Sequence, residues 1–507
     1  MCGFFAVNKC DLTEVEKEII HNSLKFRGPD FQSGVVDFAG WSMYHARLQI
    51  IGDECSGIQP YFHAGGVLLF NGEILNFQDL GVKYFNTVYT SDTVLLADLI
   101  HNKSLNLDEL DGFFAFVYID IEGNPIHAAR DKFGVKPLYK YHHEGVTAYS
   151  SEPVVLSRLF NLSVNDLAME EFKHFRAPIF EGSYYDYVSQ IEPGTCDVTG
   201  IYFDLTSSMK LSEDHPKPGE LKLAIKKGIA SRLVADQPVG LLLSKGIDSN
   251  LIRLHSSFQK FYTVGLKNDQ DLVYLKSRND LSIEFVTVSN ETFREAFFFL
   301  RELRGEPLSV PNEVYLYLVA KRAREDGVKV LLSGEGADEF FGGYDRIYTW
   351  AFQKGYEWDN SEFVELYCYQ KPTPSDLSFQ RLSSFFESLG GISAFEKVRL
   401  FFMKYHLPVL FRRLDFALMA AGVEGREPLA NNWVYQVAKR YNADDLMNNS
   451  TGKIPLRLLV AENEGEQFAF AEKVGFPVDL KSIFSDISHA KTNYETWYDV
   501  NLTGGQS

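Results

Sequence analysis

The sequence predicts two consecutive domains: an α+β domain of antiparallel sheets, then an α/β domain with a parallel sheet and a helical extension. At 507 residues the chain exceeds what one hydrophobic core usually organises. Its first part contains short apolar or alternating runs between turn signals, at 67–70, 113–119 and 148–150. Farther on, apolar strands alternate with longer helical segments, at 239–243, 262–266, 285–288 and 328–332.

A polar segment separates the two patterns. The stretch SSMKLSEDHPKPGE, at 207–220, is charged and carries two prolines, which is typical of an exposed linker. We therefore predict domains at 1–206 and 221–507. The last third is rich in aromatic residues and has helical periodicity, for example at 363–369 and 411–421, so we expect its helices to cover the sheet.

Composition excludes several classes of protein. Hydrophobic residues make up 45% and charged residues 23%, as in average globular proteins. The formal charge of -18 disfavours nucleic acid or an anionic membrane as a partner, since both bind clustered Lys and Arg. The five cysteines lack the spacing of a disulfide framework or zinc site, and no apolar run is long enough to span a bilayer. We expect a soluble, cytoplasmic protein.

The amino terminus carries the first candidate nucleophile. Cys2 follows Met1 directly, so removal of Met1 would leave a thiol and a free α-amine on one residue. An α-amine titrates near pH ~8, so it can take the thiol proton and later protonate a leaving group. Whether Met1 is removed is not decided by the sequence, and in most proteins such a start has no catalytic meaning.

Five further motifs in the first part of the chain favour a catalytic role for Cys2. In order, they are Arg27-Gly28-Pro29-Asp30, Arg47-Leu48, Asn71-Gly72-Glu73-Ile74, Ser91-Asp92 and the stretch RDKFGVKPLY at 130–139. Together with Cys2 they resemble the class II glutamine amidotransferase domain, an amino-terminal-nucleophile sandwich (αββα) of two stacked antiparallel sheets flanked by helices. The resemblance covers about the first two hundred residues. Phe26 stands where the family usually has His.

The resemblance implies a role for each motif residue. Arg47 would clamp the glutamine carboxylate, Asp92 would hold its α-ammonium, and Glu73 would support the bound glutamine. Asn71 and the backbone N–H of Gly72 would form the oxyanion hole. Taken singly, Arg47 also fits a surface ion pair, Asn71-Gly72 a hairpin turn, and Asp92 a helix N-cap.

The strand at 239–243 leads into a small-residue loop, Ser244–Ser249, and then a helix, an arrangement typical of phosphate binding. An ordinary strand-to-helix turn fits the loop alone. The loop resembles the Ser-Gly-Gly-x-Asp-Ser pyrophosphate loop of ATP pyrophosphatases, which implies an adenine-nucleotide α-hydrolase-like domain. Asp248 would bind Mg²⁺. Lys245 replaces the first glycine and would either obstruct pyrophosphate or contact it.

A second Gly-rich loop, SGEGADEFFGGY at 333–344, resembles a conserved stretch of asparagine synthetases. The resemblance implies that Asp338 is the other Mg²⁺ ligand and that Glu335 orients the acceptor or its attacking amine. Lys453, in the stretch 451–457, would stabilise charge at the α-phosphate and carbonyl. A solvated turn and a surface lysine are the alternatives. The implied nucleotide-binding residues are Leu243, Ser244, Lys245, Gly246, Ile247, Asp248, Ser249, Val264, Ser333, Gly334 and Glu335.

As a whole, the chain is similar to the glutamine-hydrolysing asparagine synthetases. This implies glutamine, ATP, Mg²⁺ and aspartate as substrates and cofactor, a β-aspartyl-AMP intermediate, and release of AMP, pyrophosphate and glutamate. Gly305, Val310 and Asn312 depart from a related bacterial stretch, so another carboxylate, on a sugar, peptide or natural product, stays open as the acceptor. A different function also stays open, in which the chain is a glutaminase joined to a regulatory module that Lys245 has made inactive in synthesis. A homodimer is one possibility for the assembly.

Overall fold

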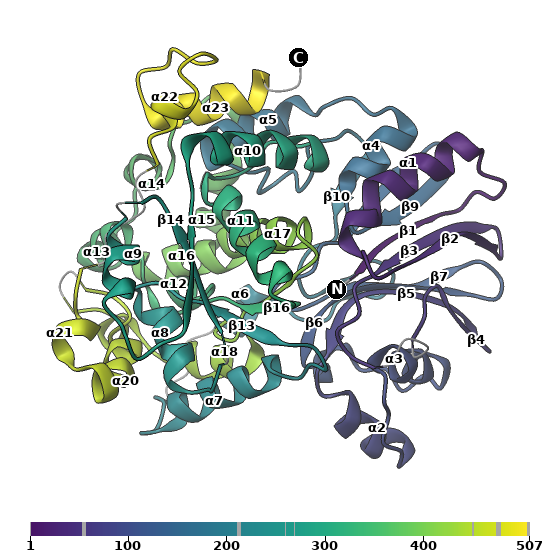
Figure 1. Ribbon diagram of the computed structural model, residues 1–507, viewed down its shortest axis with the longest axis horizontal. Coiled ribbons are helices and arrows are strands. Elements are labelled where there is room, and N and C mark those ends of the chain that lie inside the picture. The colour runs from purple at the N-terminus through teal and green to yellow at the C-terminus, as the bar shows by residue number, and fades with distance from the viewer. Residues whose placement is uncertain are drawn as a thin grey trace.

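The computed structural model describes residues 2–52, 57–209, 214–258, 260–267, 269–448, 451–472 and 478–503. Antiparallel sheets lie on one side of the molecule, and a parallel sheet surrounded by helices lies on the other (Figure 1). Met1 and residues 210–213 of the predicted linker lie outside the described residues, so the predicted boundaries remain predictions.

Six strands form the first antiparallel sheet, in the order β10-β8-β9-β1-β3-β2. Their bounds are β1 (Cys2–Val7), β2 (Phe31–Phe38), β3 (Trp41–Arg47), β8 (Tyr139–His143), β9 (Val146–Ser150) and β10 (Val188–Gln190). Along β1, Phe5 and Val7 pack with Leu24 of α1 (Glu14–Leu24). The alternate residue Phe4 packs with Leu69 of the second sheet. This alternation places β1 between a helical layer and the other sheet.

The second sheet also has six strands, in the order β12-β11-β7-β6-β5-β4. Their bounds are β4 (Tyr61–His63), β5 (Gly66–Ile74), β6 (Gly112–Asp120), β7 (Pro125–Arg130), β11 (Thr195–Cys196) and β12 (Gly200–Ile201). Leu95 and Leu99 of α3 (Asp92–His101) cover its outer face against Phe116. The other helices of this part are α2 (Phe77–Phe85), α4 (Pro153–Phe160) and α5 (Asp166–Phe175). The predicted αββα sandwich is confirmed.

A fully parallel sheet organises the second part, in the order β15-β14-β13-β16-β17. The strands are β13 (Val239–Leu242), β14 (Phe261–Gly265), β15 (Ile283–Thr287), β16 (Val330–Leu332) and β17 (Glu424–Arg426). The first four match the predicted strands. β17 was not predicted, because its sequence is Glu-Gly-Arg. Glu424 and Arg426 are buried and pair with each other at 2.5 Å, which lets a charged segment form a buried edge strand.

Helices surround this sheet, as predicted. They are α6 (Leu205–Ser208), α7 (Glu220–Arg232), α8 (Ile247–Leu254), α9 (Gln270–Lys276), α10 (Asn290–Arg304), α11 (Asn312–Glu325), α12 (Ala337–Phe341), α13 (Asp345–Lys354), α14 (Asn360–Tyr367), α15 (Leu377–Ser388), α16 (Ala394–Phe401), α17 (Leu407–Met419), α18 (Asn432–Ala438), α19 (Ala443–Leu446), α20 (Ile454–Glu464), α21 (Glu466–Ala469), α22 (Leu480–Ile483) and α23 (Asn493–Thr503). A π-helical segment at Phe402–His406 joins α16 to α17, so the helix predicted at 411–421 starts earlier.

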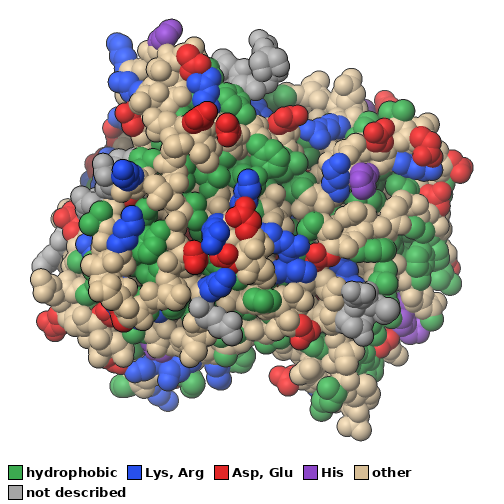
Figure 2. All heavy atoms as spheres, viewed as in Figure 1, with side chains coloured by type: hydrophobic (Ala, Val, Ile, Leu, Met, Phe, Trp, Pro, Cys, Tyr) green, Lys and Arg blue, Asp and Glu red, His purple; other side chains and the backbone are tan. Residues whose placement is uncertain are grey.

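Partly exposed ion pairs connect the first part of the molecule to the second. Asp30 pairs with Lys329 at 2.8 Å and with Arg324 at 3.2 Å. Acidic and basic side chains are interspersed on the face shown in Figure 2. Among the described residues, no helix is long and apolar enough to cross a membrane.

A buried charge network joins the two parts through α17. Glu152, at the start of α4, accepts hydrogen bonds from Arg27 at 2.6 Å and from Arg412 at 2.5 Å. Asp415, one turn along α17 from Arg412, accepts from Arg27 at 2.8 Å, and Lys136 lies 3.5 Å away. All five side chains are buried. Although burial raises the pKa of Glu152, the charges of Arg412 and Arg27 outweigh it and hold that pKa below its usual value.

We predict that Glu152→Ala lowers the free energy of unfolding by about 3–5 kcal/mol, because it leaves the Arg27 and Arg412 charges buried without their partner. Denaturant unfolding of the purified protein measures this change. The control is Glu14→Gln, which removes an ion pair whose Glu14 side chain is 90% exposed, and a loss below about 1 kcal/mol is expected there. Equal effects of the two changes would contradict the structural role of the network.

Candidate functional site

The first candidate site forms where the two antiparallel sheets meet. Cys2 opens β1, and the strand register places it opposite Arg47, the last residue of β3. The backbone N–H of Cys2 donates to Asn71 Oδ1 at 3.0 Å, which brings β5 of the other sheet to the same point. Cys2 is only 9% exposed, and burial raises the pKa of its thiol. Arg27 Nε donates to the Cys2 carbonyl at 3.0 Å from the other side.

Asn71 has an unused side-chain donor beside Cys2, and Gly72 follows it in β5. Among the described residues, Asn71 Nδ2 is buried and has no hydrogen-bond partner, so it can still donate. Gly72 has φ of 133°, and a Cβ there would lie 2.0 Å from the Phe113 carbonyl oxygen. Only glycine fits this strand position. The hairpin-turn alternative is wrong, because both residues lie inside β5 and pair with β6.

Glu73 and Asp92 form a buried acidic pair in the same site. Each is 6% exposed. Asp92 accepts a hydrogen bond from Ile74 N at 3.1 Å, and burial raises its pKa. Burial, followed by the charge of Asp92, raises the pKa of Glu73 well above its usual value. Two adjacent carboxyls with raised pKa values favour a bound cation such as an ammonium group. Ser91, not Asp92, occupies the N-cap of α3.

Arg47 is also buried, at 8% exposed. That burial excludes the alternative of a surface ion pair. A buried guanidinium near a nucleophile can clamp a carboxylate with two parallel hydrogen bonds. The site therefore combines a thiol, an unpartnered amide donor, a guanidinium and an acidic pair.

The second candidate site lies at the carboxyl ends of the parallel strands, where ligands bind in such sheets. Leu243 follows β13, Val264 lies near the end of β14, and Ser333 and Gly334 follow β16. The loop after β13 leads into α8, which starts at Ile247. These positions match the expectation for a nucleotide site, although the role of each residue stays a prediction.

Side chains hold the loop after β13 in a tight turn. Ser249 Oγ accepts from Ser244 N at 3.1 Å, and Gly246 N donates to Ser244 Oγ at 3.1 Å. Asn250 Nδ2 donates to the carbonyl oxygens of Ser244 and Gly246 at 3.0 and 2.9 Å. The loop is thereby fixed at the amino terminus of α8, where backbone N–H groups favour anions.

Lys245 does not distort this loop. It is absent from the described non-glycine residues with positive φ, so the expected dihedral penalty does not arise. Its backbone N–H donates to Asp271 Oδ2 at 3.2 Å, and its ammonium lies 5.4 Å from the centroid of the Tyr274 ring. The side chain thus extends toward α9.

Lys453 joins the two loops. Its ammonium donates to both carboxylate oxygens of Asp248 at 2.8 Å and lies 2.6 Å from Asp338 Oδ1. Lys453 is 3% exposed and has φ of 58°, a conformation uncommon for a non-glycine residue and often found at functional sites. The surface-lysine alternative is wrong.

Two carboxylates facing one cation suit a magnesium ion. Mg²⁺ is usually held by one or two carboxylates together with substrate phosphates and water. Within the described ranges, no group of three or more His, Cys, Asp or Glu could hold a metal. Asp248 and Asp338 therefore fit an ion whose remaining ligands come from a nucleotide.

Two glycines allow Asp248, Asp338 and Lys453 to lie close together. A Cβ on Gly343 would lie 1.8 Å from Asp338 Oδ1 and 2.0 Å from Lys453 Cε. A Cβ on Gly334 would lie 2.8 Å from Asp248 Cβ. Contacts this short cannot be accommodated without moving the charged groups.

Glu335 is oriented by a residue that was not predicted. Its Oε1 accepts from Arg413 at 2.5 Å, and Arg413 lies on α17 beside the buried Arg412. The available signal in the sequence was three charged residues in the otherwise apolar run LPVLFRRLDFALM. A helix apolar on all sides is buried, so its charges must have partners.

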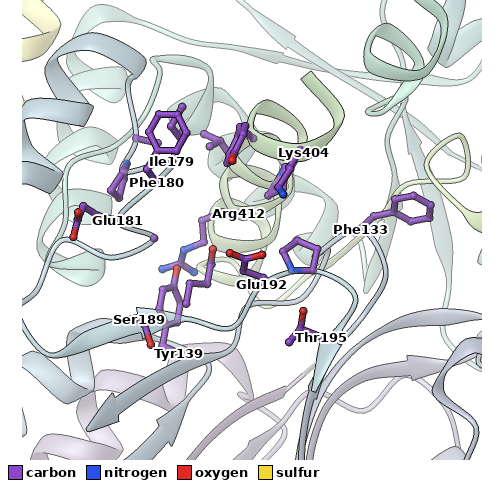
Figure 3. A pocket seen from close by; sticks show the side chains of 18 of the residues that line it. Phe133, Tyr139, Ile179, Phe180, Glu181, Ser189, Glu192, Thr195, Lys404 and Arg412 are labelled. Atoms are coloured by element: carbon purple, nitrogen blue, oxygen red, sulfur yellow. The ribbon is translucent and has the colours of Figure 1, made fainter. Parts of the chain in front are cut away.

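A cavity of about 330 Å³ lies where the two parts of the molecule meet. Tyr139 and Glu192 face Lys404 and Arg412 across it (Figure 3). None of the described residues predicted for either site lines this cavity.

Comparisons with known proteins identify a family for each of the two parts of the chain. The asparagine synthase family model matches residues 220–496, more than half of the chain. The chain belongs to this family. A glutamine amidotransferase domain model matches residues 1–202. The family assignment made from the motifs is thereby confirmed.

Curated relatives carry the same family name. The putative asparagine synthetase [glutamine-hydrolyzing] 1 of Methanocaldococcus jannaschii is 30% identical over 61% of this chain and 59% of its own length. Asparagine synthetase [glutamine-hydrolyzing] 1 of Bacillus subtilis is 31% identical over 68% and 59%. Asparagine synthetase B of Escherichia coli is 26% identical over 90% and 78%. The chain thus spans about three fifths of the length of the first two relatives.

We predict that glutamine binding weakens as the pH falls. Protonation of Asp92 and Glu73 removes the negative charge that would hold an ammonium, so KM for glutamine should rise as the pH drops through their raised pKa values. Asp92→Asn should raise KM by about ten- to a hundred-fold and flatten this pH dependence. Asp98→Asn, on the same helix but bonded to His63 and Tyr89, is the control. A KM independent of pH would count against the assignment.

A second prediction concerns Gly343. Gly343→Ala should lower pyrophosphate release about a hundred-fold while sparing glutamine hydrolysis, because the new methyl group displaces Asp338 and Lys453. Gly390→Ala is the matched control, since the nearest atom to a Cβ there is 3.9 Å away. Assays of both half-reactions on the two variants check this. Unchanged pyrophosphate release in Gly343→Ala would rule out the Asp338–Lys453 site.

Proposed function

We propose that this chain hydrolyses glutamine at Cys2 and uses ATP to convert an acceptor carboxylate into an amide. With aspartate as the acceptor, the products are asparagine, AMP, pyrophosphate and glutamate. The observation that carries the proposal is the convergence of Asp248 and Asp338 on Lys453, in a chain that also places Cys2 beside a free amide donor. The names of the curated relatives support the same reaction.

The first half-reaction starts with glutamine held between Arg47 and the acidic pair. The Cys2 thiolate attacks the side-chain amide carbon, and Asn71 Nδ2 with Gly72 N–H stabilises the oxyanion. After removal of Met1, the Cys2 α-amine takes the thiol proton and passes it to the departing ammonia. A thioester remains, and water hydrolyses it to glutamate.

The second half-reaction uses the loops after β13 and β16. The acceptor carboxylate attacks the α-phosphorus of ATP, and pyrophosphate leaves into the loop formed by Ser244–Ser249. Asp248 and Asp338 would hold Mg²⁺, which neutralises charge on the phosphates when bound. Lys453 donates to the developing charge at the α-phosphate and carbonyl. Ammonia then attacks the acyl carbon of the carboxylate–AMP anhydride, the C–O bond to AMP breaks as the C–N bond forms, and Glu335, oriented by Arg413, accepts a proton from the attacking ammonia.

Ammonia would pass directly between the two parts. After burial and the charge of Asp92, the charge of Glu424 also raises the pKa of Glu73 and that of Arg426 lowers it, so these residues of β17 lie near the first site. Arg27 contacts the Cys2 carbonyl and also Asp415 of α17. The same helix carries Arg413 to Glu335. A cytoplasmic location, where thiols stay reduced, belongs to this proposal, and dimerisation remains a prediction.

A glutaminase joined to a silenced regulatory module is the second candidate. Its basis is Lys245, which replaces a glycine in the phosphate loop. The side chain of Lys245 extends toward Tyr274, and the loop keeps its arrangement beside Asp248 and Asp338. This orientation disfavours the regulatory-module candidate.

We predict that two variants separate the half-reactions. Cys2→Ala should abolish use of glutamine but leave synthesis from ammonium salts, since only the first site needs the thiol. Asp338→Asn should reduce pyrophosphate formation by a hundred-fold or more, while glutamine hydrolysis continues. Mass spectrometry of the products, with ATP, Mg²⁺, aspartate and either amide-labelled glutamine or an ammonium salt as the nitrogen source, measures these outcomes, and pyrophosphate is followed in parallel.

Labelled asparagine matched by pyrophosphate in the unmodified enzyme would support the proposal. Loss of both activities in a well-folded Cys2→Ala protein would contradict separate sites. Glutamate without pyrophosphate, for every carboxylate tried, would favour the regulatory module instead.

A further inference from the structure

A cavity of about 560 Å³ opens beside Glu335 and Asp338, and we call it the acceptor pocket. Its walls include Val310 and Asn312, two of the positions that depart from the related bacterial stretch. Under the proposed function, on which this inference rests, the acceptor carboxylate must reach Glu335 through this space. The chemistry of the walls therefore selects the acceptor.

The volume exceeds the needs of free aspartate. Pockets for drug-sized ligands measure roughly 300–1,000 Å³, and the acceptor pocket falls within that range. The described loop residues Ser244 and Ser249 do not line it, so ATP seated on that loop would leave much of this space to the acceptor. An acceptor considerably larger than aspartate would fill it.

Among its described lining residues, the acceptor pocket has no carboxylate that lacks a cationic partner and could bind an α-ammonium. Glu335 and Asp338 are the only acidic side chains among the described residues that line it. Glu335 is paired with Arg413 at 2.5 Å, and Asp338 with Lys453 at 2.6 Å. The positive charges of Arg176 and Arg413, after burial, also hold the pKa of His406 in the wall well below its usual value. A further cation would be repelled there.

The glutamine site of the same protein provides the comparison. There, Glu73 and Asp92 are buried side by side, with burial raising both pKa values, and form an acidic pocket suited to an amino acid's α-ammonium. The acceptor pocket lacks such a pair within the described residues. A free amino acid bound in the acceptor pocket would therefore lack the contacts that Glu73 and Asp92 offer to an α-ammonium in the first site.

Aromatic rings and an arginine also line the acceptor pocket. The ring centroids of Tyr369 and Tyr494 lie 4.1 Å apart with an angle of 11° between the stacked rings, and Trp497 is a further lining residue. Arg176 lies 4.6 Å from the Tyr369 ring centroid and donates to its hydroxyl at 3.4 Å. Within the described chain Arg176 has no carboxylate partner, unlike Arg413. A ring would pack on the aromatic wall, and an anion would pair with Arg176.

From this arrangement we infer that the acceptor pocket prefers a ring-bearing carboxylate without a free α-ammonium and with a second anionic group, over free aspartate. The ring contacts the tyrosines, the second anion pairs with Arg176, and the reacting carboxylate reaches Glu335. Saturated and aromatic rings both meet this description.

The test compares kcat/KM for pyrophosphate release across defined acceptors. Glucuronic acid 1-phosphate and isophthalate carry a ring and two anionic groups. Glucuronic acid and benzoate are their single-anion controls. N-acetylaspartate removes the α-ammonium of aspartate without adding a ring. At least one two-anion ring acceptor should exceed aspartate by about ten-fold or more, and N-acetylaspartate should equal or exceed aspartate.

Variants separate the Arg176 contact from folding effects. Arg176→Gln should lower kcat/KM for the two-anion ring acceptors by about ten- to a hundred-fold, with less than about a threefold change for benzoate or glucuronic acid. Arg322→Gln is the control, since its side chain is 43% exposed on α11 outside the pocket. Arg176→Lys should restore part of the loss, because it returns a positive charge.

Aspartate as the best acceptor, with pyrophosphate formed, would overturn this inference and leave the proposed function standing. Equal loss for one- and two-anion acceptors in Arg176→Gln would also overturn it. Absence of pyrophosphate with every acceptor, while glutamine hydrolysis continues, would reject the inference together with the proposed synthesis.

Discussion

The organisation of this molecule depends on a set of charges buried where its two parts meet. Glu152 and Asp415 would be strongly destabilising alone, and so would Arg27 and Arg412. Together they compensate one another, and the free-energy cost of separating these charges holds the first part of the molecule against α17. Because Arg27 also donates to the Cys2 carbonyl, the same network positions Cys2, the candidate nucleophile.

Helix α17 transmits this constraint to the second site. Arg412 and Asp415 face the first part, while the adjacent Arg413 reaches Glu335. A helix with charged groups on two sides thus contacts both the first part of the molecule and the second candidate site. This explains why an otherwise apolar helix retains charges at adjacent positions despite the cost of burying them.

Much of this arrangement was predictable from the sequence, and the exceptions share a physical cause. Apolar runs predicted the sheets, and motifs that resemble known families, with Asn71, Asp248 and Asp338 among their residues, predicted two sites. β17 was not predicted, because its Glu-Gly-Arg sequence lacks the apolar pattern of a strand. Arg413 was not predicted, because its partner Glu335 is distant in sequence, and a local sequence pattern does not reveal such a partner. The same holds for Arg176, whose environment is built from α5, the segment after α14, and α23.

The position of Cys2 also has a consequence for the order of events during biosynthesis. Its N–H bonds to Asn71, its carbonyl bonds to Arg27, and its side chain is almost fully covered. A peptidase needs an extended, accessible chain to cut before residue 2. Removal of Met1, which the proposed function requires, would therefore have to precede the pairing of β1 with β3, and a chain that folds first would keep the α-amine of Cys2 blocked. The rate of strand docking competes with the rate of terminal processing.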